Sequence, residues 1–187
     1  MVVPVGVSRR HVHLDKDTFI KLFGSSEFPV RNYLSQPGQY ASNLTIALEW
    51  NCHVIENVRV VGPIRDYNQI ELSKDECSIL GVNPPSKQSG DLINSLPINL
   101  IGPKGKVQLS KGLIRAERHI HMQKEKADEL NLNNKEEVNI YKNDKYIFNA
   151  KIKISDPAFN ELHIDTVEEK IYDLHQGDEV RFEKCGK

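Results

Sequence analysis

Two His-x-His segments, His11-Val12-His13 and His119-Ile120-His121, constrain this chain more than any other feature of its sequence. An arginine precedes each pair, and an apolar residue follows it. On a β-strand, residues i and i+2 project from the same face, whereas on a helix they point to roughly opposite sides. A strand would therefore make each pair a chelating unit, with neutral imidazole nitrogens suited to zinc or a similar divalent metal. Because the pair occurs twice in the same frame, we predict a duplicated metal half-site.

Composition excludes several classes of protein. A chain of 187 residues fits one large domain or two small ones, and its net charge of −1 gives no strong field for nucleic acid or an anionic membrane. No apolar run approaches the roughly 20 residues that span a bilayer. Three cysteines without a Cys-x-x-Cys pair favour a reducing compartment, and residues 1–7 are too short for a signal peptide. We expect a cytoplasmic protein without nucleic-acid or membrane partners.

Short alternating segments separated by turn residues dominate the chain and predict a mainly β fold with short capping helices. Each His pair ends a strand that feeds a short helix, the first capped by Asp15 and stopped by Gly24, the second from about Lys124 to Leu130. Ser73 and Glu76 resemble a capping box. Strands are expected at residues 2–14, 43–50, 53–61, 69–72, 98–101, 106–109, 113–122, 137–141, 145–154, 161–165 and 178–182.

The offset between the His pairs predicts two similar β-barrel domains. His11 and His119 are 108 residues apart (119 − 11), and the richest turn stretch, residues 83–91, is the expected linker. We therefore predict domains at 1–85 and 86–187, with the N-terminal strand free to pack with the second half. Since binding sites are common at domain interfaces, the active site is expected at the interface of the two barrels.

Three further residues are candidates whose roles the residues alone leave open. His163 lies on the polar face of Glu161-Leu162-His163-Ile164-Asp165, beside carboxylates that could orient it as a metal ligand, but a surface histidine fits equally well. Arg65 could bind phosphate and Glu71 could complete a ligand set. From spacing alone, the simpler interpretation is that Arg65 is a solvated loop residue and that Glu71 lies on the solvent-exposed face of a strand.

The class of metal site also has alternatives. Structural zinc usually has four protein ligands, often with cysteine, whereas these His-rich pairs favour catalytic coordination with an open position. A cupin-like oxygenase also uses His-x-His on a β-barrel, but it usually places a glutamate about four residues later, where this chain enters a helix. A non-catalytic metal-binding module is the other alternative. An acyl-cysteine mechanism through Cys77 is a weaker interpretation than a buried, inert thiol.

Several separated motifs together resemble the PduL-type phosphotransacylase (phosphate propanoyltransferase) family. They fall in the family's order over nearly the whole chain, at residues 5–14, 62–65, 69–73, 89–92, 118–122 and 161–166. The resemblance implies two β-barrel domains and reversible exchange of a short acyl group, acetyl or propanoyl, between coenzyme A and inorganic phosphate. The partners would then be coenzyme A or acyl-CoA and phosphate or acyl phosphate. A homo-oligomer is left open.

The resemblance also assigns roles to individual residues. It implies that His11, His13 and Glu71 bind one metal, and that His119, His121 and His163 bind a second, with two Zn²⁺ per chain expected. It makes Arg65 the phosphate-binding residue and places Ser8 and Arg9 on the coenzyme A side.

Two departures from the family pattern leave this ligand set intact. Gln123 replaces the usual Ser or Thr cap, and Val167-Glu168-Glu169-Lys170 replaces Asp-Glu-Ala-Asn. Many members that enter bacterial microcompartments carry an N-terminal targeting helix; this sequence shows none, so a cytoplasmic location is favoured.

Overall fold

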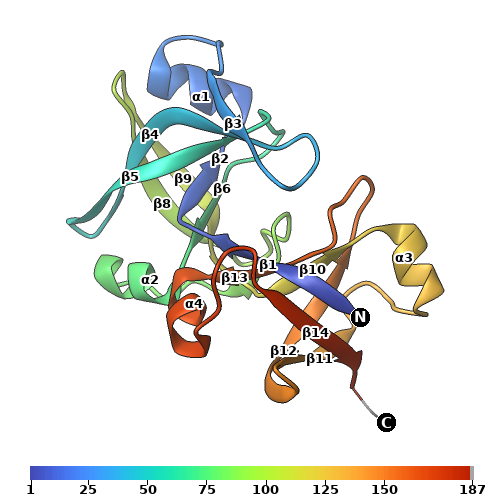
Figure 1. The fold of residues 1–187 in the computed structure, drawn as a ribbon. Helices are drawn as coiled ribbons and strands as arrows, with labels where there is room; N and C mark the ends of the chain where they lie inside the picture. The colour runs from blue at the N-terminus through green and yellow to red at the C-terminus, as the bar shows by residue number, and fades with distance from the viewer. Residues whose placement is uncertain (186–187) are drawn as a thin grey trace. The chain divides into compact units, whose positions relative to one another are not determined.

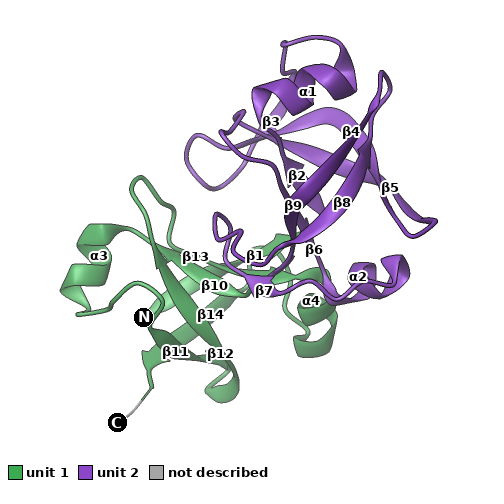
Figure 2. Cartoon of the chain, turned by 180° about the vertical axis from the view of Figure 1, so that it is seen from behind, with its two compact units in different colours: residues 1–8, 117–187 green, residues 9–116 purple. Residues whose placement is uncertain are grey.

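The structure, a computed structural model, describes residues 1–185 and divides the chain into two compact units (Figures 1 and 2). Unit 1 contains Met1–Ser8 and the chain from Glu117 onward, and unit 2 contains Arg9–Ala116. Figure 2 colours them green and purple. The chain passes from one unit to the other one residue before each Arg-His-x-His segment.

Unit 1 is a closed barrel of six strands in the order β1-β13-β10-β12-β11-β14, with β14 pairing back onto β1. Two short helices, α3 and α4, follow β10 and β13. Its elements are β1 (Val2–Ser8), β10 (His119–Met122), α3 (Lys124–Glu129), β11 (Glu137–Lys142), β12 (Lys145–Ile154), β13 (Glu161–Asp165), α4 (Thr166–Tyr172) and β14 (Glu179–Lys184).

Unit 2 also closes on itself through six strands. The order β4-β5-β2-β6-β9 is completed by β8, which pairs with both β9 and β4, while β3 and β7 extend the sheet at its margins. Its elements are β2 (His11–His13), α1 (Lys16–Phe23), β3 (Val30–Tyr33), β4 (Tyr40–Trp50), β5 (His53–Gly62), β6 (Gln69–Leu72), α2 (Lys74–Leu80), β7 (Ser86–Lys87), β8 (Leu96–Ile101) and β9 (Lys106–Ala116). The predicted mainly β fold with two barrels is confirmed.

Each unit has its own apolar core, and strand alternation decides which residues enter it. In unit 1, Ile120 of β10 and Leu162 of β13 are fully buried in the core. In unit 2, Val12 of β2 and Ile70 of β6 are buried in the same way. The histidines and carboxylates that alternate with these residues therefore project from the opposite face of the strands.

The predicted caps explain where the helices begin and end. Asp15 accepts a hydrogen bond from the Thr18 backbone N–H at 2.7 Å, and Gly24 ends α1 with φ 73°. Ser73 and Glu76 form the predicted capping box of α2. Gln123, in contrast, makes no side-chain cap for α3, as its departure from Ser or Thr suggests.

Several predicted strands differ from those in the structure. The expected strand 2–14 is broken into β1 and β2, and the expected strand 113–122 is divided between β9 and β10. In both cases the break separates the two units, and it falls at two consecutive charged residues, Arg9-Arg10 in the first and Glu117-Arg118 in the second. β3 was not expected because all four of its residues are exposed and it lacks an apolar face.

The expected linker at 83–91 lies inside unit 2. It forms a loop that includes β7, whose Ser86 and Lys87 pair with Arg115 and Ala116 of β9. Turn-forming residues mark loops within a domain as well as linkers between domains. Composition alone therefore could not distinguish this loop from a linker. The N-terminal strand β1 pairs with β13 and β14 of unit 1.

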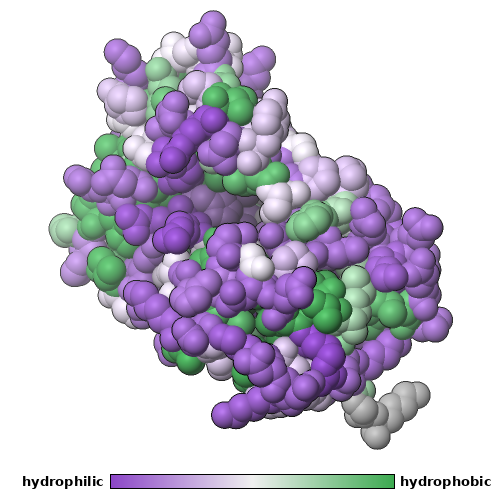
Figure 3. All heavy atoms as spheres, viewed as in Figure 1, coloured by the Kyte–Doolittle hydropathy of each residue, from purple (hydrophilic) through white to green (hydrophobic). Residues whose placement is uncertain are grey.

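Hydrophilic residues predominate on the face shown in Figure 3, with hydrophobic residues in small groups between them. Within the described residues, no helix has both the length and the apolar character needed to cross a membrane.

Candidate metal sites

The first candidate site lies on two adjacent strands of unit 2. His11 and His13 project from β2, and Glu71 projects from β6, its antiparallel neighbour. His11 lies directly opposite Glu71 in the strand register. One ligand atom from each of the three residues lies within 4.8 Å of the others, so they could hold a single metal ion.

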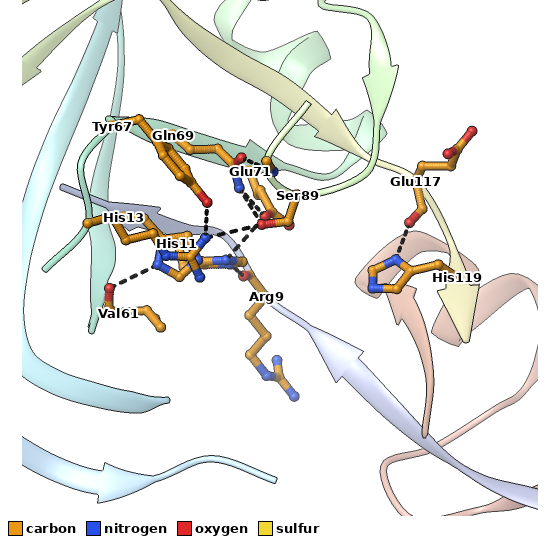
Figure 4. Close-up of polar contacts among 12 residues, drawn as sticks. Arg9, His11, His13, Val61, Tyr67, Gln69, Glu71, Ser89, Glu117 and His119 are labelled. Atoms are coloured by element: carbon orange, nitrogen blue, oxygen red, sulfur yellow. Dashed lines mark hydrogen bonds and ion pairs between the residues drawn. The ribbon is translucent and has the colours of Figure 1, made fainter. Parts of the chain in front are cut away.

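Backbone carbonyl groups fix the orientation of both imidazoles in this group. His11 Nδ1 lies 2.9 Å from the Arg9 carbonyl oxygen, and His13 Nδ1 lies 3.0 Å from that of Val61 (Figure 4). Because a carbonyl oxygen can only accept, Nδ1 carries the proton in the neutral ring and Nε2 carries the lone pair. This is the second-shell hydrogen bond that metal-binding histidines usually make.

Glu71 is held by a network that sequence reasoning did not identify. Its Oε1 accepts a hydrogen bond from Gln69 Nε2 at 2.5 Å and lies 3.7 Å from His11 Nε2. Gln69, fully buried, also donates to Ser89 Oγ at 2.8 Å and accepts from the Gly90 backbone N–H at 2.7 Å. Gln69 and Ser89 stood within the family motifs, but only the fold shows that the loop at 89–90 supports the β6 carboxylate (Figure 4).

The second candidate site repeats this plan in unit 1. His119 and His121 project from β10, and His163 projects from the antiparallel strand β13. His119 lies directly opposite His163, just as His11 lies opposite Glu71. These three histidines also bring their ligand atoms within 4.8 Å of one another.

His119 uses the same backbone contact as His11. Its Nδ1 lies 2.8 Å from the carbonyl oxygen of Glu117, two residues earlier (Figure 4). His11 Nδ1 likewise contacts the carbonyl oxygen of Arg9, two residues before it. His119 Nε2 is therefore the unprotonated nitrogen of the neutral ring. It faces His121 Nε2 at 3.0 Å, and His121 Nδ1 is buried without a hydrogen-bond partner among the described residues.

Glu161 orients the third histidine. Its Oε2 lies 2.7 Å from His163 Nε2 and accepts that proton, which leaves the lone pair on Nδ1. A carboxylate behind a histidine is a common second-shell arrangement at zinc sites. Gly6 of β1 lies opposite His163, and a Cβ there would come within 2.7 Å of Glu161 Cδ and 2.9 Å of His163 Cδ2. The Glu161–His163 pair thus occupies the space next to residue 6 that any side chain there would need, so only glycine fits.

The electrostatics of the second group favour neutral imidazoles at His119 and His121. Burial lowers the pKa of His119 well below its ordinary value, and the neighbouring His163 and Lys153 lower it further. Burial also lowers the pKa of His121 strongly, with His119, His163 and Lys153 adding to the effect. Neutral imidazole is the form that binds a metal, so His119 and His121 are ready to bind one at neutral pH.

The donor sets fit zinc. Tetrahedral zinc with Zn–N bonds of 2.0–2.1 Å would separate two ligand nitrogens by about 3.3 Å. The 3.0 Å between His119 Nε2 and His121 Nε2 is close to this separation, so a single cation could bind both nitrogens. Three ligands per group also leave a fourth position, as catalytic zinc requires.

Arg65 lies near the first group and is held by its neighbours. Its Nη1 donates to Tyr67 Oη at 2.5 Å and reaches Ser89 Oγ at 3.5 Å, while its backbone N–H donates to the Leu14 carbonyl oxygen at 2.9 Å. Ser89 therefore contacts both Arg65 and Gln69, the residue that holds Glu71.

Ser8 and Arg9 have different surroundings. Ser8 ends β1 opposite Asp165 of unit 1, whereas the exposed Arg9 begins unit 2 and extends its side chain away from His11 and His13 (Figure 4). Cys77 is buried in the core of unit 2, and Cys52 and Cys185 are exposed.

The fold and these two groups define a two-barrel protein with two duplicated, His-rich candidate metal sites. The family model described as phosphate propanoyltransferase matches residues 4–175. The chain therefore belongs to the phosphate propanoyltransferase family. Relatives that carry this name include those of Thermotoga maritima, 39% identical over 94% of this chain and 86% of the relative, and Rhodobacter capsulatus, 37% identical over 98% and 87%. The relative of Rhodopseudomonas palustris is 36% identical over 96% of this chain and 81% of its own length.

Proposed function

We propose that this protein catalyses the reversible reaction of a short-chain acyl-CoA, acetyl- or propanoyl-CoA, with inorganic phosphate to give an acyl phosphate and coenzyme A. The observation that carries the proposal is the grouping of ligands: two separate three-residue sets, each on a pair of antiparallel strands, in a chain of the phosphate propanoyltransferase family. A duplicated site suits a reaction with two charged groups to neutralise, a phosphate and a thiolate.

We assign one zinc ion to each group, so that His11, His13 and Glu71 hold one and His119, His121 and His163 hold the other. Bound zinc would supply Lewis-acid chemistry, lowering the pKa of the coenzyme A thiol and drawing charge from phosphate and carbonyl oxygens. The two groups differ in their ligands, since one includes a carboxylate and the other consists of three histidines.

The acyl group moves in one displacement. A phosphate oxygen attacks the thioester carbonyl carbon, the new C–O bond forms, the C–S bond breaks, and coenzyme A leaves as the thiolate. Arg65 binds the phosphate oxygens and orients the attacking oxygen, since its guanidinium is permanently charged and held by Tyr67 and Ser89. In the opposite direction the thiolate attacks the acyl phosphate, and Arg65 stabilises the departing phosphate.

The transfer needs no acyl-enzyme intermediate. Cys77 is only 5% exposed and packs in the unit 2 core, so an acyl group could not reach its thiol without opening that core. Ser8 and Arg9 are assigned to the coenzyme A side; of the two, the exposed Arg9 guanidinium suits a phosphate of the coenzyme.

The test is release of free thiol by the purified, zinc-loaded chain from acetyl-, propanoyl- and butanoyl-CoA, with and without phosphate. We expect thiol release that depends on phosphate and is fastest with acetyl- or propanoyl-CoA. The matched control is Glu136→Gln, which neutralises a carboxylate that belongs to neither ligand set. Absence of phosphate-dependent release with every acyl-CoA would refute the proposal and favour a non-catalytic metal-binding module.

A further inference from the structure

The arginine before each His pair makes the same kind of ion pair in both units. Arg10 Nη1 lies 3.1 Å from Glu76 Oε1 in unit 2, and Arg118 Nε lies 2.9 Å from Glu168 Oε1 in unit 1. The two glutamates are mostly shielded, with side chains 12% and 18% exposed. The ion pair is thus duplicated together with the ligands.

Both glutamates hold the same place in the helix that follows the third ligand. Glu76 is the N3 residue in the capping box of α2, whose N-cap Ser73 comes two residues after Glu71. Glu168 is the N3 residue in the capping box of α4, whose N-cap Asp165 comes two residues after His163. Each glutamate therefore lies a fixed number of residues beyond a candidate ligand, five in both cases (76 − 71 and 168 − 163).

Each carboxylate uses its two oxygens for two tasks. Glu76 accepts from the Ser73 backbone N–H at 2.9 Å through Oε2 and pairs with Arg10 through Oε1. Glu168 accepts from the Asp165 backbone N–H at 3.2 Å through Oε2 and pairs with Arg118 through Oε1. One oxygen fixes the helix start to the ligand strand, and the other fixes it to the strand of the His pair.

These contacts close a ring around each candidate site. The ring runs from the first histidine to its preceding arginine, across the ion pair to the helix, and back along the ligand strand to the third ligand. That ligand lies directly opposite the first histidine, His11 opposite Glu71 and His119 opposite His163. A partly exposed ion pair contributes little to overall stability, so fold stability alone gives no reason for its repetition at this point.

We propose that Arg10–Glu76 and Arg118–Glu168 are positioning pairs that hold the two ligand strands of each site in register for metal binding. The inference rests on the proposed function in that it requires each three-residue group to bind a metal. Neither the arginines nor the glutamates belong to a candidate ligand group. Each pair acts on the separation between the first histidine and the third ligand.

The two pairs are anchored to different degrees. The Arg118 guanidinium also lies over the Phe148 ring, 4.6 Å from its centroid, and 6.0 Å from that of Tyr172. These aromatic contacts keep Arg118 in place when its carboxylate partner is neutralised. We therefore expect loss of the ion pair to weaken the unit 2 site more than the unit 1 site.

The test uses Glu76→Gln and Glu168→Gln, because glutamine keeps the capping box while removing the charge. The control is Glu136→Gln: Glu136 also accepts from the backbone N–H three residues earlier, at 2.8 Å from Asn133, and lies 3.6 Å from Lys184, but it is attached to neither ligand set. Zinc affinity of each metal-stripped full-length protein is measured by competition with a chromophoric chelator. Cobalt(II) absorption reports the coordination geometry, and thermal unfolding reports the stability of the metal-free chain.

We expect Glu76→Gln to weaken one of two zinc sites about tenfold or more, the range for lost outer-shell partners, and to shift its cobalt spectrum. Glu168→Gln should weaken the other site by less, and Glu136→Gln should change neither. Arg10→Lys, which keeps the charge, should retain more affinity than Arg10→Met. Wild-type zinc affinity in both Glu76→Gln and Glu168→Gln, or a loss of affinity no larger than that of Glu136→Gln, would refute the positioning role. It would leave the metal assignment standing. A wild-type chain that binds no zinc would instead refute the metal assignment on which they rest.

Discussion

His11 of β2 and Glu71 of β6 lie directly opposite each other across an antiparallel strand pair. Opposite residues on one face of such a pair have Cβ atoms about 4.5–5.5 Å apart, close enough to share a metal ion. His119 and His163 have the same relationship in unit 1. The candidate sites are therefore a consequence of strand register: each His pair supplies two ligands along one strand, and the neighbouring strand supplies the third across from the first.

Replacing the carboxylate ligand tests the unit 2 site. Glu71→Gln keeps the size of the side chain and its contact with Gln69 but removes the negative charge that would bind zinc. We expect the purified variant to hold one zinc per chain where the wild type holds two, measured by elemental analysis after dialysis. Glu49→Gln, which removes a carboxylate paired with Lys106 elsewhere in unit 2, should retain both. Two tightly held zinc ions in Glu71→Gln would contradict the ligand assignment.

Filling the space at Gly6 tests the unit 1 site. In Gly6→Ala the new methyl group would collide with the Glu161–His163 pair, which must move to accommodate it. We expect weaker zinc binding at the unit 1 site and a loss of about 1–3 kcal/mol in unfolding free energy, the usual cost of overpacking. The unit 2 site serves as the internal control and should keep its affinity. Unchanged affinity at both sites would show that Gly6 does not constrain His163.

Arg65→Ala tests the phosphate-binding role. Loss of hydrogen bonds from a charged group costs about 1.5–3 kcal/mol, so we expect the KM for phosphate to rise about 10- to 100-fold. The KM for acyl-CoA should change far less. Tyr67→Phe removes only a neighbour that accepts from Arg65 and should have a smaller effect in the same direction. Steady-state kinetics with each substrate varied in turn separate the two constants, and equal effects on both would count against a phosphate role.

The stability of the metal-free chain should depend on pH through His119 and His121. Their pKa values are lowered in the folded state, so as the pH falls below about 6.5 the unfolded chain takes up protons that the folded chain does not. The stabilising difference is fully present above that pH and decreases below it, by up to about 1.4 kcal/mol per pH unit for each histidine. Denaturant unfolding between pH 7 and 5 measures the slope. A double His119→Asn, His121→Asn variant should show a shallower slope, and an identical slope would contradict the role of these two histidines.

The local features were predictable from the sequence, and the non-local ones were not. The His pairs were visible because two ligands lie on one strand, and the caps at Asp15 and Ser73 because capping is local. Their third partners were not fixed by spacing: Glu71 follows His11 by 60 residues (71 − 11), whereas His163 follows His119 by 44 (163 − 119). Only the strand register reveals that, despite these different offsets, each third ligand lies opposite the first histidine of its pair.

The division into units shows the same limit. The apolar positions change parity between β1 (Val3, Val5, Val7) and β2 (Val12, Leu14), but this change does not show that Ser8 belongs to unit 1 and Arg9 to unit 2. The pairing of β1 with β13 depends on residues more than 150 positions away, Val5 with Leu162 for example. The support of Glu71 by Gln69 and Ser89 likewise requires a loop to return to β6.

The most direct test of the proposed metal-dependent reaction is to remove the metal and restore it. The purified chain is stripped with a chelator, dialysed, and titrated with zinc while phosphate-dependent release of coenzyme A from propanoyl-CoA is followed. We predict that the stripped protein is inactive, that activity returns with zinc and levels off at two equivalents per chain, and that His11→Asn and His163→Asn remain inactive when zinc is added. Full activity in the stripped protein, or in either histidine variant, would contradict the claim that these two ligand sets perform the reaction.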